Sequence, residues 1–327
     1  MQNLPDDVKR TFCRLITENA HPEIIKLLVS LRAKVDLSID DAGWALWNIC
    51  DRYALMRDAT NQHKYQLEFH EWSKTHLFPL RLHWVVSDGT QALTLIDGGF
   101  LEFWWNCYEF ANAHAPLVPE NRTVRFESHR ANAGAYSRFR EFARAETALN
   151  AMERLLAEDP KWCNREFAAA TFKTLLIKSY TAKGLSDEAA ATGESLQREL
   201  DDWLGRAGDA QSASECPLLG SWDNRNKKRP STAVFVAINN AACALTQARQ
   251  FPAGERLFQI LLERNRTLNA YGEAQYLLSR WKNTRNKDEI IERLHSLMVS
   301  QKLTPKALQR FVPELVDVVK ADRPNFA

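Results

Sequence analysis

The 327-residue sequence is poor in glycine and proline, with twelve of each. All-β proteins need these residues in their many turns, so their scarcity argues against a β-sandwich or a β-barrel. A composition of 45% hydrophobic and 26% charged residues is typical of a folded globular chain. We therefore expect an all-α protein in which long helices are joined by short connections.

Long apolar runs and paired cysteines are also missing. The longest apolar runs, such as Ala233 to Ile238, fall far short of the ~20 residues that a membrane span requires. The N-terminal segment MQNLPDDVKR has acidic residues where a secretory signal has an apolar stretch. The six cysteines lie far apart without a C-x-x-C pair, which is typical of reduced thiols in a protein core. These features predict a cytoplasmic protein that does not bind membranes.

Sequence signatures of catalysis are missing as well. The chain has no glycine-rich phosphate loop, no Ser/His/Asp set and no H-E-x-x-H pair. His63 and His70 are seven residues apart, and on a helix that spacing is a rise of about 10 Å, too far for one metal ion. We therefore predict a non-enzymatic protein that needs no metal and no cofactor.

Helix boundaries are well marked in residues 1–118. Ser38 and Asp41 match the capping-box pattern ahead of an apolar helical segment. Gly98 and Gly99 separate two further helical segments. We predict a helical N-terminal region that ends near residue 118.

From residue 119 onward the sequence consists of paired helical segments, of which the clearest are 132–160, 175–200 and 239–265. The second helix of each pair has a small residue near its start, and these residues are Ala145, Ala189 and Gly254. Few β-carbons on a helix surface let two helices pack at the short end of the usual range of ~8–10 Å. Arg144 is one position from Ala145, so we expect it to face solvent.

These pairs resemble tetratricopeptide (TPR) repeats. In that family the small residue of the second helix meets a small residue and an aromatic residue on the first. The resemblance implies an α-solenoid of TPR-like hairpins over residues 119–327, with large residues such as Leu149 and Phe258 closing the hairpins. The spacing departs from the family, because the small residues lie 44 and 65 positions apart and the family period is ~34. Gly193 also stands where a large residue is expected, so other α-solenoids of helical hairpins fit the sequence too.

The longer interval is mostly residues 205–231, which are rich in Gly, Ser, Asp and Asn. We predict a long polar surface loop there. Two helices, 288–302 and 304–320, follow the last pair. The second has Thr304 as its cap and Pro305 in its first turn, and the two helices are expected to cap the array.

Basic residues are the main candidates for partner binding. Residues 1–116 hold 11 Lys/Arg and 15 Asp/Glu, whereas the remainder holds 32 and 26. Arg130 and Arg138 are eight positions apart and are expected to line a groove, since guanidinium groups bind carboxylates and phosphates bidentately. A solvated face with Glu127 and Glu141 as local partners is the other interpretation.

The run RNKKR is interpreted first as part of a soluble loop, second as a nucleic-acid contact and third as a localisation signal. The predicted partner-binding residues are Arg130, Arg138, Lys178, Arg225, Lys227, Lys228 and Arg229.

The function expected from these features is a scaffold or adaptor that holds another protein or a peptide in the concave face of its repeats. One alternative is a nucleic-acid-associated regulatory protein that uses the basic second half. The other is a ribonuclease of the HEPN class, because Arg122 and His129 resemble the R-x4–6-H element of that family. In the repeat interpretation, His129 opens the first repeat helix.

Overall fold

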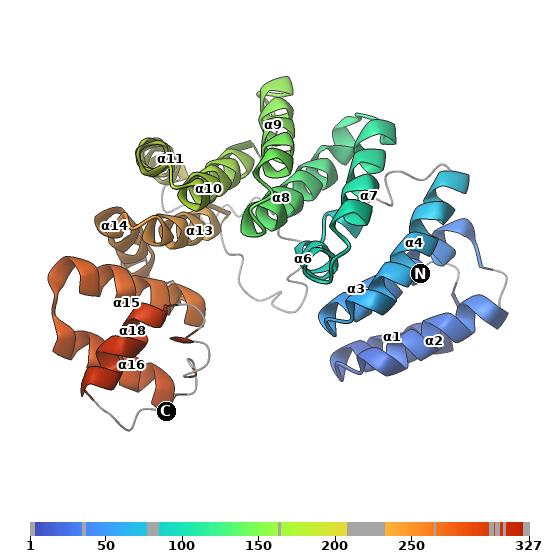
Figure 1. The fold of residues 1–327 in the computed structure, drawn as a ribbon, viewed down its shortest axis with the longest axis horizontal. Coiled ribbons are helices and arrows are strands. Elements are labelled where there is room, and N and C mark those ends of the chain that lie inside the picture. Colours follow the sequence, from blue (N-terminus) through green and yellow to red (C-terminus); the bar gives the residue numbers. More distant parts are fainter. Residues whose placement is uncertain are drawn as a thin grey trace. The chain divides into compact units, whose positions relative to one another are not determined.

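The computed structural model describes residues 4–34, 37–76, 85–162, 165–207, 233–264, 266–300, 304, 308–309 and 312–322. Every regular element in these residues is helical and none is a strand, which confirms the predicted all-α class. No helix among them is long and apolar enough to cross a membrane. The chain divides into two compact units, Met1–Leu155 and Leu156–Ala327, and each is described by itself (Figure 1).

In its described part, the first unit consists of successive helix pairs. The pairs are α1 (Asp6–Thr17) with α2 (His21–Lys34), α3 (Ile39–Leu55) with α4 (Ala59–Thr75), α6 (Gly89–Asp97) with α7 (Leu101–His114), and α8 (Arg122–Arg138) with α9 (Phe142–Glu158). A short 3-10 helix, η1 (Pro119–Asn121), precedes α8.

The second unit is organised in the same way. Its pairs are α10 (Arg165–Lys183) with α11 (Ser186–Ala207), α13 (Ala233–Gln247) with α14 (Phe251–Glu263), and α15 (Ala270–Thr284) with α16 (Lys287–Val299), followed by α18 (Pro313–Asp322). The unit boundary at 155/156 places α8 and most of α9 with the N-terminal helices, whereas the predicted division at 118/119 marked the start of the paired segments.

One kind of turn joins the two helices of every pair. A residue with positive φ follows the first helix, and a single further residue precedes the second. The described residues with positive φ are the residues of these seven turns: Asn19, Arg57, Gly99, Arg140, Gly184, Arg249 and Arg285. Two of the seven are glycine, and the others hold a left-handed conformation that side chains rarely adopt.

Backbone hydrogen bonds explain why the turn is so short. At Arg249, its N–H donates to the carbonyl of Thr246 at 3.0 Å, and the N–H of Gln250 donates to the carbonyl of Leu245 at 2.9 Å. This is the Schellman motif, and six of the seven turns have it. Arg285 instead donates to Trp281, in the simpler left-handed motif. Gln250 is also the N-cap of α14, so one residue ends the first helix and begins the second.

The common turn fixes which residue of the second helix faces the first. The residue five positions after the positive-φ residue is buried in all seven pairs, and these residues are Ile24, Gln62, Trp104, Ala145, Ala189, Gly254 and Ile290. The three small residues singled out in the sequence are among them. A β-carbon at Gly254 would lie 2.5 Å from the Thr246 hydroxyl and 3.2 Å from the Ala242 carbonyl oxygen, so α13 and α14 approach closely there.

The structure explains why residue 193 is glycine, which the repeat pattern does not. A β-carbon at this position would lie 2.5 Å from the Gln250 side-chain oxygen and 2.7 Å from a methyl group of Leu245. Both residues belong to the end of α13 and the turn that follows it. Glycine on α11 therefore makes room for the next helix pair.

Within each unit the pairs pack in the same order. In the first unit α6 contacts α3 and α8, and in the second α13 contacts α10 and α15. First helices therefore lie against first helices. Second helices such as α4 and α14 also contact the first helix of the following pair.

Three sequence predictions are corrected by the described residues. The predicted loop begins too early, because α11 continues through Gly205 to Ala207; residues 208–231 lie outside the described residues. The predicted helix 304–320 is interrupted, because α18 starts at Pro313, which has no N–H for a continuous helix. His129 lies in the middle of α8 and does not open it.

Arg144 does not face solvent as predicted. Its guanidinium donates to both carboxylate oxygens of Glu102 on α7, at 2.7 Å each, and lies 5.2 Å from the centre of a Trp105 ring. Arg144 therefore ties α9 to α7, which no spacing within α9 reveals.

Candidate partner-binding surfaces

A polar stripe crosses the most buried helix of the second unit. Helix α13 is almost entirely apolar on its packed sides, and residues 241–246 are all buried. Asn239, Cys243 and Gln247 follow one another at four-residue spacing, which places them on one face of α13. Gln247 is exposed and Asn239 is partly exposed. The middle residue, Cys243, is buried, so the stripe is open only at its two ends, Asn239 and Gln247.

Two residues of the flanking first helices extend this stripe. Lys178 of α10 is exposed and lies close enough to Cys243 for its charge to act on the thiol. On the other side, the Gln247 amide donates to the Tyr271 hydroxyl of α15. We call Lys178, Asn239, Gln247 and Tyr271 the amide strip. It runs across three consecutive first helices.

Burial keeps two acidic groups, the Tyr271 phenol of the strip and the Cys243 thiol beside it, protonated near neutral pH. Burial raises the pKa of the Cys243 thiol to about 12, and the Lys178 ammonium opposes this rise. Burial likewise raises the pKa of the Tyr271 phenol to about 12. Among the described residues, no carboxylate contributes to either shift. The strip therefore offers amide and hydroxyl hydrogen bonds beside one positive charge, and supplies no activated nucleophile.

A cavity of about 690 Å³ lies in the same unit, at the start of α10. Its floor and walls are apolar and its rim is charged. The lining residues are Leu156, Pro160, Lys161, Trp162, Arg165, Glu166, Ala169, Ala170, Phe172, Lys173, Glu199, Leu200, Asp202 and Trp203. We call it the tryptophan pocket, after Trp162 and Trp203. Its volume falls in the range of ~300–1,000 Å³ that is usual for ligand sites.

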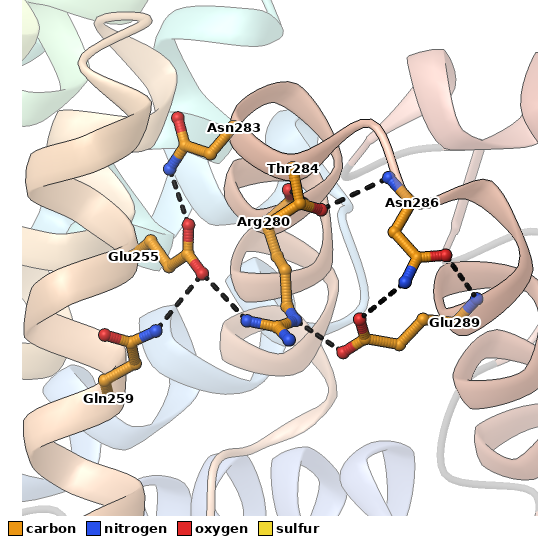
Figure 2. A network of polar contacts seen from close by, with 7 residues as sticks. All are labelled: Glu255, Gln259, Arg280, Asn283, Thr284, Asn286 and Glu289. Atoms are coloured by element: carbon orange, nitrogen blue, oxygen red, sulfur yellow. Dashed lines mark hydrogen bonds and ion pairs between the residues drawn. The ribbon is translucent and has the colours of Figure 1, made fainter.

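A second, smaller cavity of about 440 Å³ lies beside a charged network that links α14, α15 and α16 (Figure 2). Arg280 is at the centre of this network. Its guanidinium donates to Glu255 of α14 at 3.1 Å and to Glu289 of α16 at 2.5 Å. One side chain of a first helix thus binds the second helices on both sides of it.

Glu255 is buried but fully satisfied in this network. Besides Arg280, it accepts hydrogen bonds from Asn283 at 2.6 Å and Gln259 at 3.2 Å (Figure 2). A buried carboxylate with this many donors is held in place and is poorly suited to bind a partner. We therefore interpret the network as a structural clamp between helix pairs.

The two arginines that are predicted to line a groove, Arg130 and Arg138, both lie on α8. The Arg130 guanidinium donates to Glu127 at 2.7 Å, one of the two local partners anticipated from the sequence. Arg138 is exposed and is the last residue of α8. No described contact joins the two arginines, so the interpretation as a solvated face fits Arg130 better.

The structure describes one of the other predicted binding residues and leaves four outside its described part. Lys178 lies in the amide strip. Arg225, Lys227, Lys228 and Arg229 lie outside the described residues.

The histidines lie in packed surroundings. His129 is 2% exposed, and its ring Nδ1 is 2.8 Å from the Tyr108 hydroxyl. His63 stacks on Phe100 with ring centres 4.1 Å apart, and burial lowers its pKa. His70 contacts the edge of Phe110, at 5.2 Å between ring centres. No group of potential metal ligands occurs among the described residues. His129 is thus a buried side chain of α8 that contacts α7, and the ribonuclease alternative stays a prediction.

Sequence reasoning missed most of the residues in these two sites. Asn239, Gln247 and Tyr271 of the strip, and both tryptophans of the pocket, were not singled out. One signal was present, since α13 reads AVFVAINNAACALTQ and its few polar side chains stand out at helical spacing.

No protein-family model matches this sequence, and neither a curated protein nor a solved structure is significantly similar to it. The function is therefore inferred from the residues of the molecule itself.

Proposed function

We propose that this protein is a non-enzymatic scaffold that binds a peptide segment of a partner protein on the amide strip. The observation that carries the proposal is the row of hydrogen-bonding side chains on α13 and α15, with Lys178 of α10 beside it. An Asn or Gln amide both donates and accepts, so it matches the N–H and C=O groups of a peptide backbone. The Lys178 ammonium suits an acidic side chain or a terminal carboxylate.

The arrangement of helix pairs supports the same proposal. In a TPR-like α-solenoid, first helices pack on first helices and form one continuous inner face. The contacts of α13 with α10 and α15 have this order, and the shared turn gives every pair the same geometry. A repeat array of this kind offers an extended surface, which suits an extended peptide.

The test is a selection of peptides from a random display library on the purified full chain. The binding of recovered peptides is then measured by fluorescence anisotropy on two variants, Asn239→Ala and Gln247→Ala. Because each substitution removes about one hydrogen bond, each should weaken binding about fivefold to tenfold. Asn150→Ala is the matched control, since Asn150 is exposed on α9 and far from α13 in sequence. If the recovered peptides bind all three variants like the wild type, the amide strip is not the binding surface.

A further inference from the structure

The tryptophan pocket has a pattern of charges that its own packing does not explain. Three of the residues that line it are basic and three are acidic. Lys173 is neutralised, because it donates to Glu199 at 2.5 Å and to the Ser195 hydroxyl at 2.8 Å. Glu166 and Asp202 each take part in a further interaction. The remaining charges are therefore those of Lys161 and Arg165.

Within the described part of the chain, neither Lys161 nor Arg165 has a side-chain hydrogen bond or an ion pair. Both are exposed at the rim of the pocket. Arg165 is also the first residue of α10, where the helix dipole disfavours a cation by about 0.3–1 kcal/mol. Arg165 therefore does not stabilise α10 through the helix dipole, and its guanidinium lies exposed at the rim of the pocket.

The apolar part of the pocket indicates which group a ligand would have besides a negative charge. Trp162 and Trp203 are only partly buried, and Leu156, Ala170 and Leu200 are buried in the floor. Indole rings bury a large area and are the side chains most enriched where interfaces concentrate their binding energy. The pocket therefore suits one large apolar side chain, with an anionic group held at Lys161 and Arg165.

We propose that the tryptophan pocket binds an acidic peptide segment of a partner protein through one large aromatic or aliphatic side chain. A peptide fits better than a nucleic acid for an electrostatic reason. Nucleic-acid sites neutralise a series of phosphates, whereas this rim offers two uncompensated cations among the described residues, Lys161 and Arg165. The pocket and the amide strip share no residue, so the proposal stands independently of the proposed function.

The experiment uses the full chain and a pool of fluorescein-labelled decapeptides. Each peptide has Phe, Trp or Leu at its centre, three acidic residues among the other positions, and Gly or Ser elsewhere. Binding is followed by fluorescence anisotropy. We expect at least some members to bind with Kd values well below 1 mM, and peptides with Ala at the centre or Lys in place of the acids to bind at least tenfold more weakly.

Two variants locate the binding site. Arg165→Glu should weaken binding at least tenfold by reversing one of the two free charges, and Trp203→Ala should do the same by removing a pocket wall. Arg198→Glu makes the same charge change at an exposed position of α11 that does not line the pocket, and should leave binding unchanged. Circular dichroism of each variant verifies that the helices are intact.

Several outcomes would overturn the proposal. It is wrong if no member of the pool binds below about 1 mM, or if Arg165→Glu and Arg198→Glu behave alike. Equal binding of the Lys-containing peptides would also contradict it. Tighter binding of a labelled ten-nucleotide single strand than of every peptide would assign the pocket to nucleic acid instead. Loss of binding in Gln247→Ala alone would move the site to the amide strip.

Discussion

Helices α4 and α14 follow the same turn but bury opposite kinds of side chain. Five and nine positions after the turn, α14 has Gly254, which has no side chain, and Phe258, which packs in an apolar cluster. The equivalent residues of α4 are Gln62 and Gln66, both fully buried. Both polar atoms of the Gln66 side chain are buried without a hydrogen-bond partner among the described residues.

The polar interior of α4 continues beyond its glutamines. His70 and Ser73 are also buried on this helix, and burial lowers the pKa of His70 because it disfavours the imidazolium form. A buried polar group without a partner costs about 1–3 kcal/mol. The difference between α4 and α14 shows that the turn sets the geometry of a helix pair, whereas the interior side chains set its stability. The interior of the first unit should therefore be the less stable one.

The largest expected effect comes from filling the closest helix contact of the second unit. Gly254→Leu adds a side chain where even a β-carbon would lie 2.5 Å from Thr246, whose hydroxyl is held by Ala242 and Ser279. We expect a loss of about 3 kcal/mol or more in the free energy of unfolding, at the upper end of overpacking effects. Urea unfolding followed by circular dichroism measures it.

Gly205→Ala is the control for this substitution. Gly205 lies near the end of α11, and a β-carbon added there would meet no atom within 4 Å. Alanine there should be neutral or stabilise by up to about 1 kcal/mol. Equal effects of the two substitutions would mean that α13 and α14 are not in close contact.

Ala145→Leu tests whether the same turn position is equally restrictive in the first unit. Ala145 is fully buried in the cluster that contains Tyr136, so leucine should cost about 1–3 kcal/mol. Ala143→Leu is the matched control, because Ala143 is exposed two positions earlier on α9. Similar urea midpoints for the two variants would mean that this turn position is less restrictive in the first unit than in the second.

Gln66→Leu tests the polar interior directly. The substitution removes two buried polar atoms that have no described partner and leaves a side chain of similar size. We expect the free energy of unfolding to rise by about 1–2 kcal/mol. If the substitution instead lowers the free energy of unfolding, the Gln66 amide is hydrogen-bonded in solution. The buried glutamines of α4 would then not make its helix pair less stable than that of α14.

Asp88→Asn gives the smallest effect, and one that depends on pH. Burial raises the pKa of Asp88 to about 6 from an ordinary value of 3.8, with Asp51 adding to the rise. The folded state therefore binds a proton more readily than the unfolded state, so the wild type gains stability as the pH falls through 6 towards 4. Asparagine keeps the oxygen that caps α6, through the N–H groups of Thr90 and Gln91, and removes the buried charge.

The variant should thus be more stable than the wild type by about 1–2 kcal/mol at pH 7.5. This advantage should shrink as the pH falls through 6 and vanish below the ordinary pKa of 3.8, where Asp88 is protonated in both the folded and the unfolded state. Thermal unfolding of both proteins at several pH values measures the difference. A constant difference over this range would contradict the raised pKa.

Local features of the fold were predictable from the sequence. Ser38 caps α3 through the N–H of Asp41, as its spacing predicted. Two helices meet at Gly98 and Gly99, because glycine at positive φ ends a helix at little cost. Buried small residues at the start of second helices were also evident, since small side chains at such positions report on close helix packing.

Other features were not predictable, for physical reasons. Arginine is uncommon at positive φ, so Arg57, Arg140, Arg249 and Arg285 gave no sign of the turns they form. The burial of Gln62 on α4 was not predictable either, since it results from tertiary packing that helix periodicity does not encode.

The candidate sites were harder to predict than the fold. Lys178 of the amide strip was among the predicted binding residues, whereas Asn239, Gln247 and Tyr271 were not. The tryptophan pocket combines residues from the end of α9 to the end of α11, and its character depends on which cations remain unpaired. Pairing is a property of the folded chain: Lys173 and Arg165 are indistinguishable in the sequence as cations of α10.

The shared turn also constrains how the length of this chain can change during evolution. Gln250 both closes α13 and begins α14, so one inserted residue at this point would rotate α14 by about 100° and carry Phe258 away from the core. The positive-φ residues are already spaced unevenly along the sequence, so the length of chain between one turn and the next varies. Insertions and deletions in related chains should therefore fall between helix pairs, while the seven turns keep their length.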